Sequence, residues 1–105
     1  MSTLSTHVLD AVSGVPAVGV TVTLYRPAQQ LDSGVTDADG RIGQFGAALA
    51  PGTYRLVFDT GAYFARRDIE TFYPEVAIAF VVTGERHYHV PLLLSPFAFS
   101  TYRGS

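Results

Sequence analysis

The stretch His87-Tyr88-His89-Val90-Pro91-Leu92-Leu93-Leu94-Ser95-Pro96 decides how this chain is interpreted. It is an apolar run of the length of one strand, which the chain enters from the turn signal Thr83-Gly84-Glu85-Arg86 and leaves at its terminal Ser-Pro pair. In an extended strand successive side chains point to opposite faces, so His87 and His89 share one face and Tyr88 takes the other. The stretch therefore predicts a strand that carries two imidazoles on one side.

Short alternating segments of the same kind, separated by Gly, Pro and Asp, lie before and after it. Strands are predicted at Thr6–Val12, Val20–Tyr25, Val35–Thr36, Thr53–Asp59, Val76–Val82 and Phe97–Arg103, and one short amphipathic helix between Gly61 and Phe72. This spacing is typical of an all-β antiparallel sandwich or barrel. Two details add to the prediction. Val76–Val82 is apolar on both faces, as in a central strand, and Pro91 lacks an N–H group, which predicts an edge or a bulge.

Length and composition limit the function. A chain of 105 residues is the size of one domain, which we expect to span residues 1–105. The absence of cysteine excludes disulfides, thiolate catalysis and cysteine-type zinc sites, and the seven basic residues are all Arg, which excludes lysine-based chemistry. A net charge of -2 without a basic cluster argues against a nucleic-acid partner, and no apolar run approaches the roughly 20 residues of a membrane span.

The balance of apolar and charged residues points to self-association. With 48% hydrophobic and 15% charged residues, we expect more apolar surface than one small core can hide, and an oligomer is the natural place to bury it. The start of the sequence has neither a basic n-region nor an apolar h-region, so we expect the bacterial cytoplasm as the location.

Several polar residues could carry chemistry. The pair His87 and His89 could hold a metal or place one imidazole beside a substrate, with His7 as a third member if its strand lies alongside. Two ligands do not make a zinc site, and for each histidine taken alone a structural or surface role is the more common outcome. Arg41 follows the turn Asp37-Ala38-Asp39-Gly40. Its planar guanidinium group could bind an anion through two hydrogen bonds, or it could be an ordinary solvated turn arginine. The two turn aspartates are interpreted as backbone caps rather than as paired catalytic acids.

Five segments in combination resemble one known family. They are Leu4-Ser5-Thr6-His7-Val8-Leu9-Asp10, Asp39-Gly40-Arg41, Phe72-Tyr73-Pro74, residues 87–96 and the terminal Ser100-Thr101-Tyr102-Arg103-Gly104-Ser105. Together they closely resemble the transthyretin-related 5-hydroxyisourate hydrolases, over the chain from end to end. The resemblance implies a transthyretin-like sandwich of two four-stranded sheets with one short α-helix, assembled as a homotetramer, a dimer of dimers.

The resemblance also implies an activity and a site. The reaction is hydrolysis of 5-hydroxyisourate to 2-oxo-4-hydroxy-4-carboxy-5-ureidoimidazoline in urate catabolism, with no metal and no organic cofactor. The catalytic positions carry over to His7, Arg41, His89 and Ser105, and Tyr102 and Arg103 join His7 and Arg41 in binding the substrate. The alternative is a transthyretin-like module that binds a small ligand or hormone without catalysis, a branch in which the histidine pair and the Tyr-Arg-Gly-Ser end are lacking.

Overall fold

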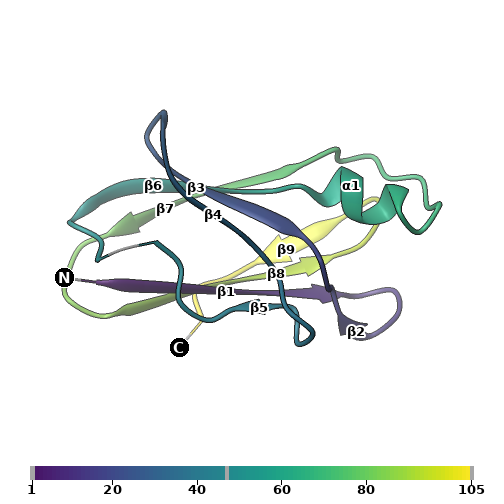
Figure 1. Ribbon diagram of the computed structural model, residues 1–105, viewed down its shortest axis with the longest axis horizontal. Helices are drawn as coiled ribbons and strands as arrows, with labels where there is room; N and C mark the ends of the chain where they lie inside the picture. Colours follow the sequence, from purple (N-terminus) through teal and green to yellow (C-terminus); the bar gives the residue numbers. More distant parts are fainter. Residues whose placement is uncertain (1, 47, 105) are drawn as a thin grey trace.

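The computed structural model describes residues 2–46 and 48–104, and within these the chain forms nine strands and one helix (Figure 1). The elements are β1 (Thr3–Asp10), β2 (Val15–Pro16), β3 (Thr21–Arg26), β4 (Gln29–Val35), β5 (Arg41–Ile42), β6 (Gly52–Phe58), α1 (Thr60–Ala65), β7 (Val76–Val82), β8 (His87–Leu94) and β9 (Phe99–Thr101). The strands predicted at Val76–Val82 and His87–Leu94 are confirmed to the residue. No helix in this part of the chain is long and apolar enough to cross a membrane.

The strands form two layers, with α1 at one end of the molecule (Figure 1). Among the described residues one sheet has the order β2-β1-β8-β9, with the two-residue β5 also paired to β1, and the other has the order β4-β3-β6-β7. The central pair of the first sheet, β1 and β8, is parallel, whereas the other pairs in both sheets are antiparallel. The predicted sandwich of two sheets with one short helix is confirmed, and β5 adds a fifth strand to the first sheet.

The core lies between the sheets and follows the alternation of the sequence. Val22 and Leu24 of β3 are fully buried, as are Leu56 and Phe58 of β6, while the residues between them face outward or lie half-exposed. Burial of one apolar face per strand is the main stabilising contribution in a sandwich of this size. Every buried side-chain nitrogen or oxygen in residues 2–46 and 48–104 has a hydrogen-bond partner.

The helix α1 is tied to the first sheet by a buried polar contact. It begins after Asp59, whose side chain accepts a hydrogen bond from the Ala62 N–H at 3.3 Å, as an N-cap does. The buried hydroxyl of Tyr63 donates to Oδ2 of Asp10 at the end of β1, at 2.8 Å. The predicted short helix begins at Thr60, one residue before the predicted window, and ends at Ala65, inside it. Asp68, three residues further on, adopts a left-handed φ of 56° that stops further helix.

Three sequence-based details were wrong or incomplete. β4 was predicted only as Val35–Thr36, because its mainly exposed residues lack the apolar alternation that marks a buried strand. β7 was interpreted as a central strand, but it lies at the edge of its sheet, with Ala77, Ala79 and Val81 exposed. β8, expected at an edge or bulge because of Pro91, lies between β1 and β9.

Candidate active site

The outer face of the first sheet brings together side chains from three strands. Parallel pairing of β1 with β8 sets Ser5 beside His89, and antiparallel pairing of β1 with β5 sets His7 opposite Arg41. On β1 the residues next to these, Leu4, Thr6 and Val8, are buried in the core. Alternation therefore places Ser5, His7, Arg41 and His89 on the opposite face, away from the core. β1 thus lies alongside the histidine strand, which was the condition for His7 to join the histidine pair.

Ser5, which the sequence interpretation did not single out, links the two histidines of β8. Its Oγ lies 2.7 Å from Nε2 of His87 and 2.7 Å from Nδ1 of His89. The other ring nitrogen of His87, Nδ1, lies 2.7 Å from Oγ1 of Thr3. Thr3, His87, Ser5 and His89 thus form one continuous hydrogen-bonded chain. Only the placement of Ser5 within the segment quoted for the family resemblance could have pointed to it.

The environment of His89 favours the neutral imidazole. Burial lowers its pKa below the ordinary value of about 6.5, and the positive charges of Arg41, His7 and His87 lower the pKa further. A neutral histidine with one lone pair free can take a proton from water at neutral pH. In the described part of the chain, His89 forms its side-chain hydrogen bond through Nδ1, so its Nε2 is the nitrogen available for that role.

Arg41 is held by the turn that precedes it. Oδ1 of Asp37 accepts the backbone N–H of Asp39 at 2.9 Å and that of Arg41 at 3.0 Å, and these two bonds lower the pKa of Asp37 despite an opposing effect of burial. Gly40 has a φ of 73°, and a side chain there would overlap the carbonyl oxygen of Val8. The interpretation of Asp37 as a backbone cap agrees with these bonds. The turn fixes Arg41 beside His7.

The C-terminal segment runs back along β8 and reaches His89. The N–H of Gly104 donates to the carbonyl oxygen of His89 at 2.9 Å, and a Cβ on Gly104 would lie only 2.5 Å from Cδ2 of the His89 ring. Gly104 is therefore in direct contact with the imidazole. Ser105, the fourth predicted catalytic residue, lies outside the described residues.

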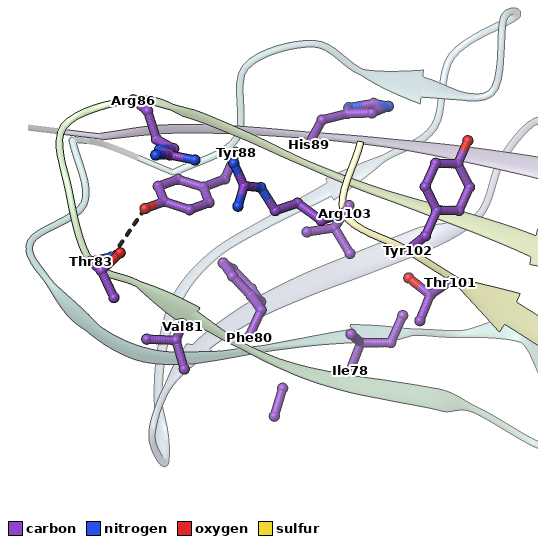
Figure 2. Close-up of a pocket in the computed structure, with 12 residues that line it drawn as sticks. Ile78, Phe80, Val81, Thr83, Arg86, Tyr88, His89, Thr101, Tyr102 and Arg103 are labelled. Atoms are coloured by element: carbon purple, nitrogen blue, oxygen red, sulfur yellow. Dashed lines mark hydrogen bonds between the residues drawn. The ribbon is translucent and has the colours of Figure 1, made fainter. Parts of the chain in front are cut away.

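The two predicted binding residues of this segment point to different sides. Continuing the register of β8 with β9 to the bridge between His89 and Gly104 sets Tyr102 opposite Pro91 and Arg103 opposite the core residue Val90. Tyr102 thus shares the face of His89, and Figure 2 shows Arg103 directed away from it, toward the side of Tyr88 and Arg86. The sequence grouped Tyr102 and Arg103 together, and the strand alternation separates them.

Arg103 lines a pocket of about 370 Å³ where the edges of the two sheets meet the C-terminal segment. Apolar residues of β7, including Ile78 and Phe80, form one wall, and Tyr88, His89 and Tyr102 contribute to the other (Figure 2). His7 and Arg41 do not line it, because their strands, β1 and β5, lie on the side of β8 away from the C-terminal segment. His89 is the predicted catalytic residue at which the pocket and the outer face meet.

Tyr88 gives this pocket a weakly acidic hydroxyl. Its oxygen accepts the backbone N–H groups of Thr83 at 3.0 Å and Gly84 at 3.3 Å, and these bonds lower the pKa of Tyr88 to about 8. Within residues 2–46 and 48–104, no group of three or more His, Cys, Asp or Glu side chains is arranged to hold a metal ion.

Comparison with known proteins finds relatives that resemble this chain in sequence and in structure. The model of the HIUase/Transthyretin family matches residues 4–104. The 5-hydroxyisourate hydrolase of Salmonella typhimurium is 48% identical over 109 residues, which cover 97% of this chain and 80% of the relative. The structure of Klebsiella pneumoniae 5-hydroxyisourate hydrolase superposes with a TM-score of 0.94 at 50% identity, covering 100% of this chain and 94% of that one. Sea bream transthyretin in complex with thyroxine superposes with a TM-score of 0.90 at 35% identity, covering 96% and 93% of the two chains.

Proposed function

The chain belongs to the HIUase/Transthyretin family, and we propose on that basis that it hydrolyses 5-hydroxyisourate to 2-oxo-4-hydroxy-4-carboxy-5-ureidoimidazoline in urate catabolism. The activity is that of a cyclic amide hydrolase, which opens the six-membered ring of its substrate. The observation that carries the proposal is the outer face of the first sheet. There the strand registers bring His7, Arg41 and His89 together, although they come from three separate parts of the chain.

The proposed roles follow from charge and position. His89, held neutral by its surroundings, removes a proton from water, and His7 serves with it in moving protons. Arg41 holds the substrate and offsets the negative charge on oxygen as the tetrahedral adduct forms. Positioned acid-base help of this kind is worth about 10²- to 10⁴-fold in rate.

The C-terminal segment completes the proposed site. Tyr102, on the face of His89, forms a side of the substrate site, and Arg103 acts from the pocket on the other side of the strand. Ser105 is proposed to orient a histidine or the substrate through its hydroxyl and terminal carboxylate. No resident cofactor or metal takes part in this scheme.

We further propose that residues 1–105 form one domain and that four copies assemble as a dimer of dimers. Exposed apolar side chains support self-association, among them Phe97 at 61% and Val81 at 57% exposure. Light scattering after size-exclusion chromatography tests the tetramer. The bacterial cytoplasm stays a prediction, which fractionation of the source cells tests.

The alternative is a non-catalytic ligand-binding module, as the likeness to sea bream transthyretin in complex with thyroxine suggests. We favour the hydrolase because Tyr102 stands on the face that such a ligand would occupy and because imidazoles line that face. Thyroxine should therefore bind weakly or not at all, which isothermal titration calorimetry measures.

The deciding experiment follows the ultraviolet decay of 5-hydroxyisourate, generated in place from urate with urate oxidase. Wild type should accelerate the decay, and His89→Ala and a chain that lacks Ser105 should fall to near the spontaneous rate. A folded, tetrameric wild type that only matches the spontaneous rate would refute the enzyme and leave ligand binding as the leading function.

A further inference from the structure

The chain of hydrogen bonds from His89 to the start of β1 and β8 has a feature that neither the fold nor the proposed roles require. Ser5 is 8% exposed, and its one hydroxyl contacts ring nitrogens of both His87 and His89 at 2.7 Å. His87 is exposed and contacts Oγ1 of exposed Thr3 through its other nitrogen. A half-buried imidazole is thus connected, through one buried hydroxyl, to an imidazole in contact with solvent.

When both histidines are neutral, two arrangements let the Ser5 hydroxyl donate within this chain. A serine hydroxyl has one hydrogen and each neutral imidazole has one N–H, so when the hydroxyl donates within the chain it donates to one imidazole and accepts from the other. If His89 donates from Nδ1, Ser5 donates to Nε2 of His87 and His87 donates from Nδ1 to Thr3. If Ser5 instead donates to His89, every bond in the chain reverses. In both arrangements the tautomer of one histidine fixes that of the other.

We propose that Ser5 and His87 form a proton relay: when His89 takes a proton from water, its Nδ1 proton moves to Ser5 and the Ser5 proton moves to His87 at the exposed start of β8. This inference rests on the proposed hydrolase function and assigns a role to residues that function does not otherwise use. Ser5 acts through His89, so it is a positioning and relay residue rather than one that contacts the substrate.

The relay transfers one net proton through three successive proton movements, and it balances. As the water oxygen bonds to the carbonyl carbon of the substrate, a water proton moves to Nε2 of His89. The Nδ1 proton of His89 then moves to Oγ of Ser5, whose own proton moves to Nε2 of His87. When the C–N bond of the ring breaks, the leaving nitrogen takes a proton from Nε2 of His89 and the same steps run in reverse. The relay returns to its starting arrangement.

The surroundings explain why the positive charge should rest on His87 rather than on His89. His89 is half-buried and faces His7 from β1 and Arg41 from β5, with Tyr102 and Gly104 on the side of the C-terminal segment. An imidazolium there is poorly hydrated and repelled by the neighbouring guanidinium. His87 is exposed, so water can hydrate its charged form. Transfer of the proton from His89 to His87, its neighbour on the same face of β8, removes the positive charge from the vicinity of Arg41.

Substitution of Ser5 tests the relay. Ser5→Ala should lower kcat by roughly 10- to 100-fold with little change in KM, since only proton transfer is impaired. Ser5→Thr retains the hydroxyl and should recover much of the loss. His87→Gln, which can hydrogen-bond but cannot store a proton, should cause a similar loss, and the double variant Ser5→Ala/His87→Gln should be no slower than Ser5→Ala alone. Ser33→Ala, which removes a strand hydroxyl on the other sheet, is the matched control and should leave kcat unchanged.

Two readouts separate a relay from a merely structural role. The proton inventory of kcat in mixtures of H₂O and D₂O should be curved for wild type, since more than one proton moves, and linear for Ser5→Ala. In the free protein, ¹⁵N spectra should show His87 and His89 titrating together in wild type and independently in Ser5→Ala.

The outcomes are distinguishable. An active wild type with unchanged kcat and inventory in Ser5→Ala overturns the relay alone, as do additive losses in the double variant. A wild type inactive toward 5-hydroxyisourate overturns the proposed function and with it the catalytic role of the relay.

Discussion

Gly104→Ala should disable the site without unfolding the protein. A Cβ at this position would lie 2.5 Å from Cδ2, 3.1 Å from Cγ and 3.2 Å from Cβ of His89, whereas ordinary contacts begin at 3.4 Å. The nearest separation must therefore grow by about 1 Å, either by rotation of the imidazole or by withdrawal of the C-terminal segment. Either movement disturbs the ring that we propose as the general base.

The expected loss can be scaled from that displacement. A misplacement of about 1 Å in a catalytic group costs about 10²-fold in rate, so kcat/KM for 5-hydroxyisourate should fall by about that factor. Global stability should change little, because the segment beside Gly104 is exposed and few core contacts depend on it. The assay is the ultraviolet decay of 5-hydroxyisourate at matched enzyme concentration, with thermal unfolding followed by circular dichroism as the measure of stability.

Gly84→Ala is the matched control, because a Cβ there would meet nothing within 4 Å. It should retain wild-type activity. If Gly104→Ala also keeps its full kcat/KM, the contact between this glycine and the imidazole has no catalytic importance, and the proposed position of the C-terminal segment in the site is refuted.

Three further predictions concern protonation and the buried polar contact. Tyr63→Phe removes the 2.8 Å hydrogen bond to the buried Asp10 and should lower the free energy of unfolding by about 1–3 kcal/mol in urea titrations, and an unchanged midpoint would contradict this. Burial raises the pKa of Asp10, but hydrogen bonds from Tyr63, Ser13 and Val12 outweigh burial and lower the pKa below its usual value. The stability that this carboxylate contributes should therefore be present above about pH 4 and be lost as the pH falls through the lowered pKa. Asp10→Asn should flatten that acid dependence. Because burial and nearby positive charges lower the pKa of His89 in the free protein, the acid limb of kcat/KM should lie below the ordinary histidine value of about 6.5, and a limb at or above it would argue against His89 as the base.

The strands with strong alternation could be predicted from sequence, and those without it could not. The alternation of Val22 and Leu24 with polar residues predicts a buried strand face, which the structure confirms. β4 has mostly exposed residues and shows no such alternation. The edge position of β7 was missed for a related reason. A strand that is apolar on both faces shows the same sequence pattern whatever covers its outer face and whether or not it has a neighbour on each side. Periodicity alone therefore cannot tell a central strand from an edge strand.

The site was predictable as a set of residue types but not as an arrangement. His7, Arg41 and His89 were identified by resemblance, and their convergence depends on the parallel pairing of β1 with β8, which no local pattern encodes. Ser5 was missed because a serine in a strand has no signal of its own. Its importance appears only when the register places it between two imidazoles.

Pro91 connects the local chemistry of β8 with the course of the C-terminal segment. Without an N–H it cannot donate to the strand beside it, and at this point Thr101 donates its side-chain hydroxyl to the Pro91 carbonyl at 2.8 Å instead. The pairing then resumes at the bridge between His89 and Gly104. The interruption thus falls opposite Tyr102, the residue that shares the face of His89. The sequence suggested that Pro91 marks an edge or a bulge, whereas it removes one backbone donor within the sheet, two residues from the imidazole on which the proposed chemistry depends.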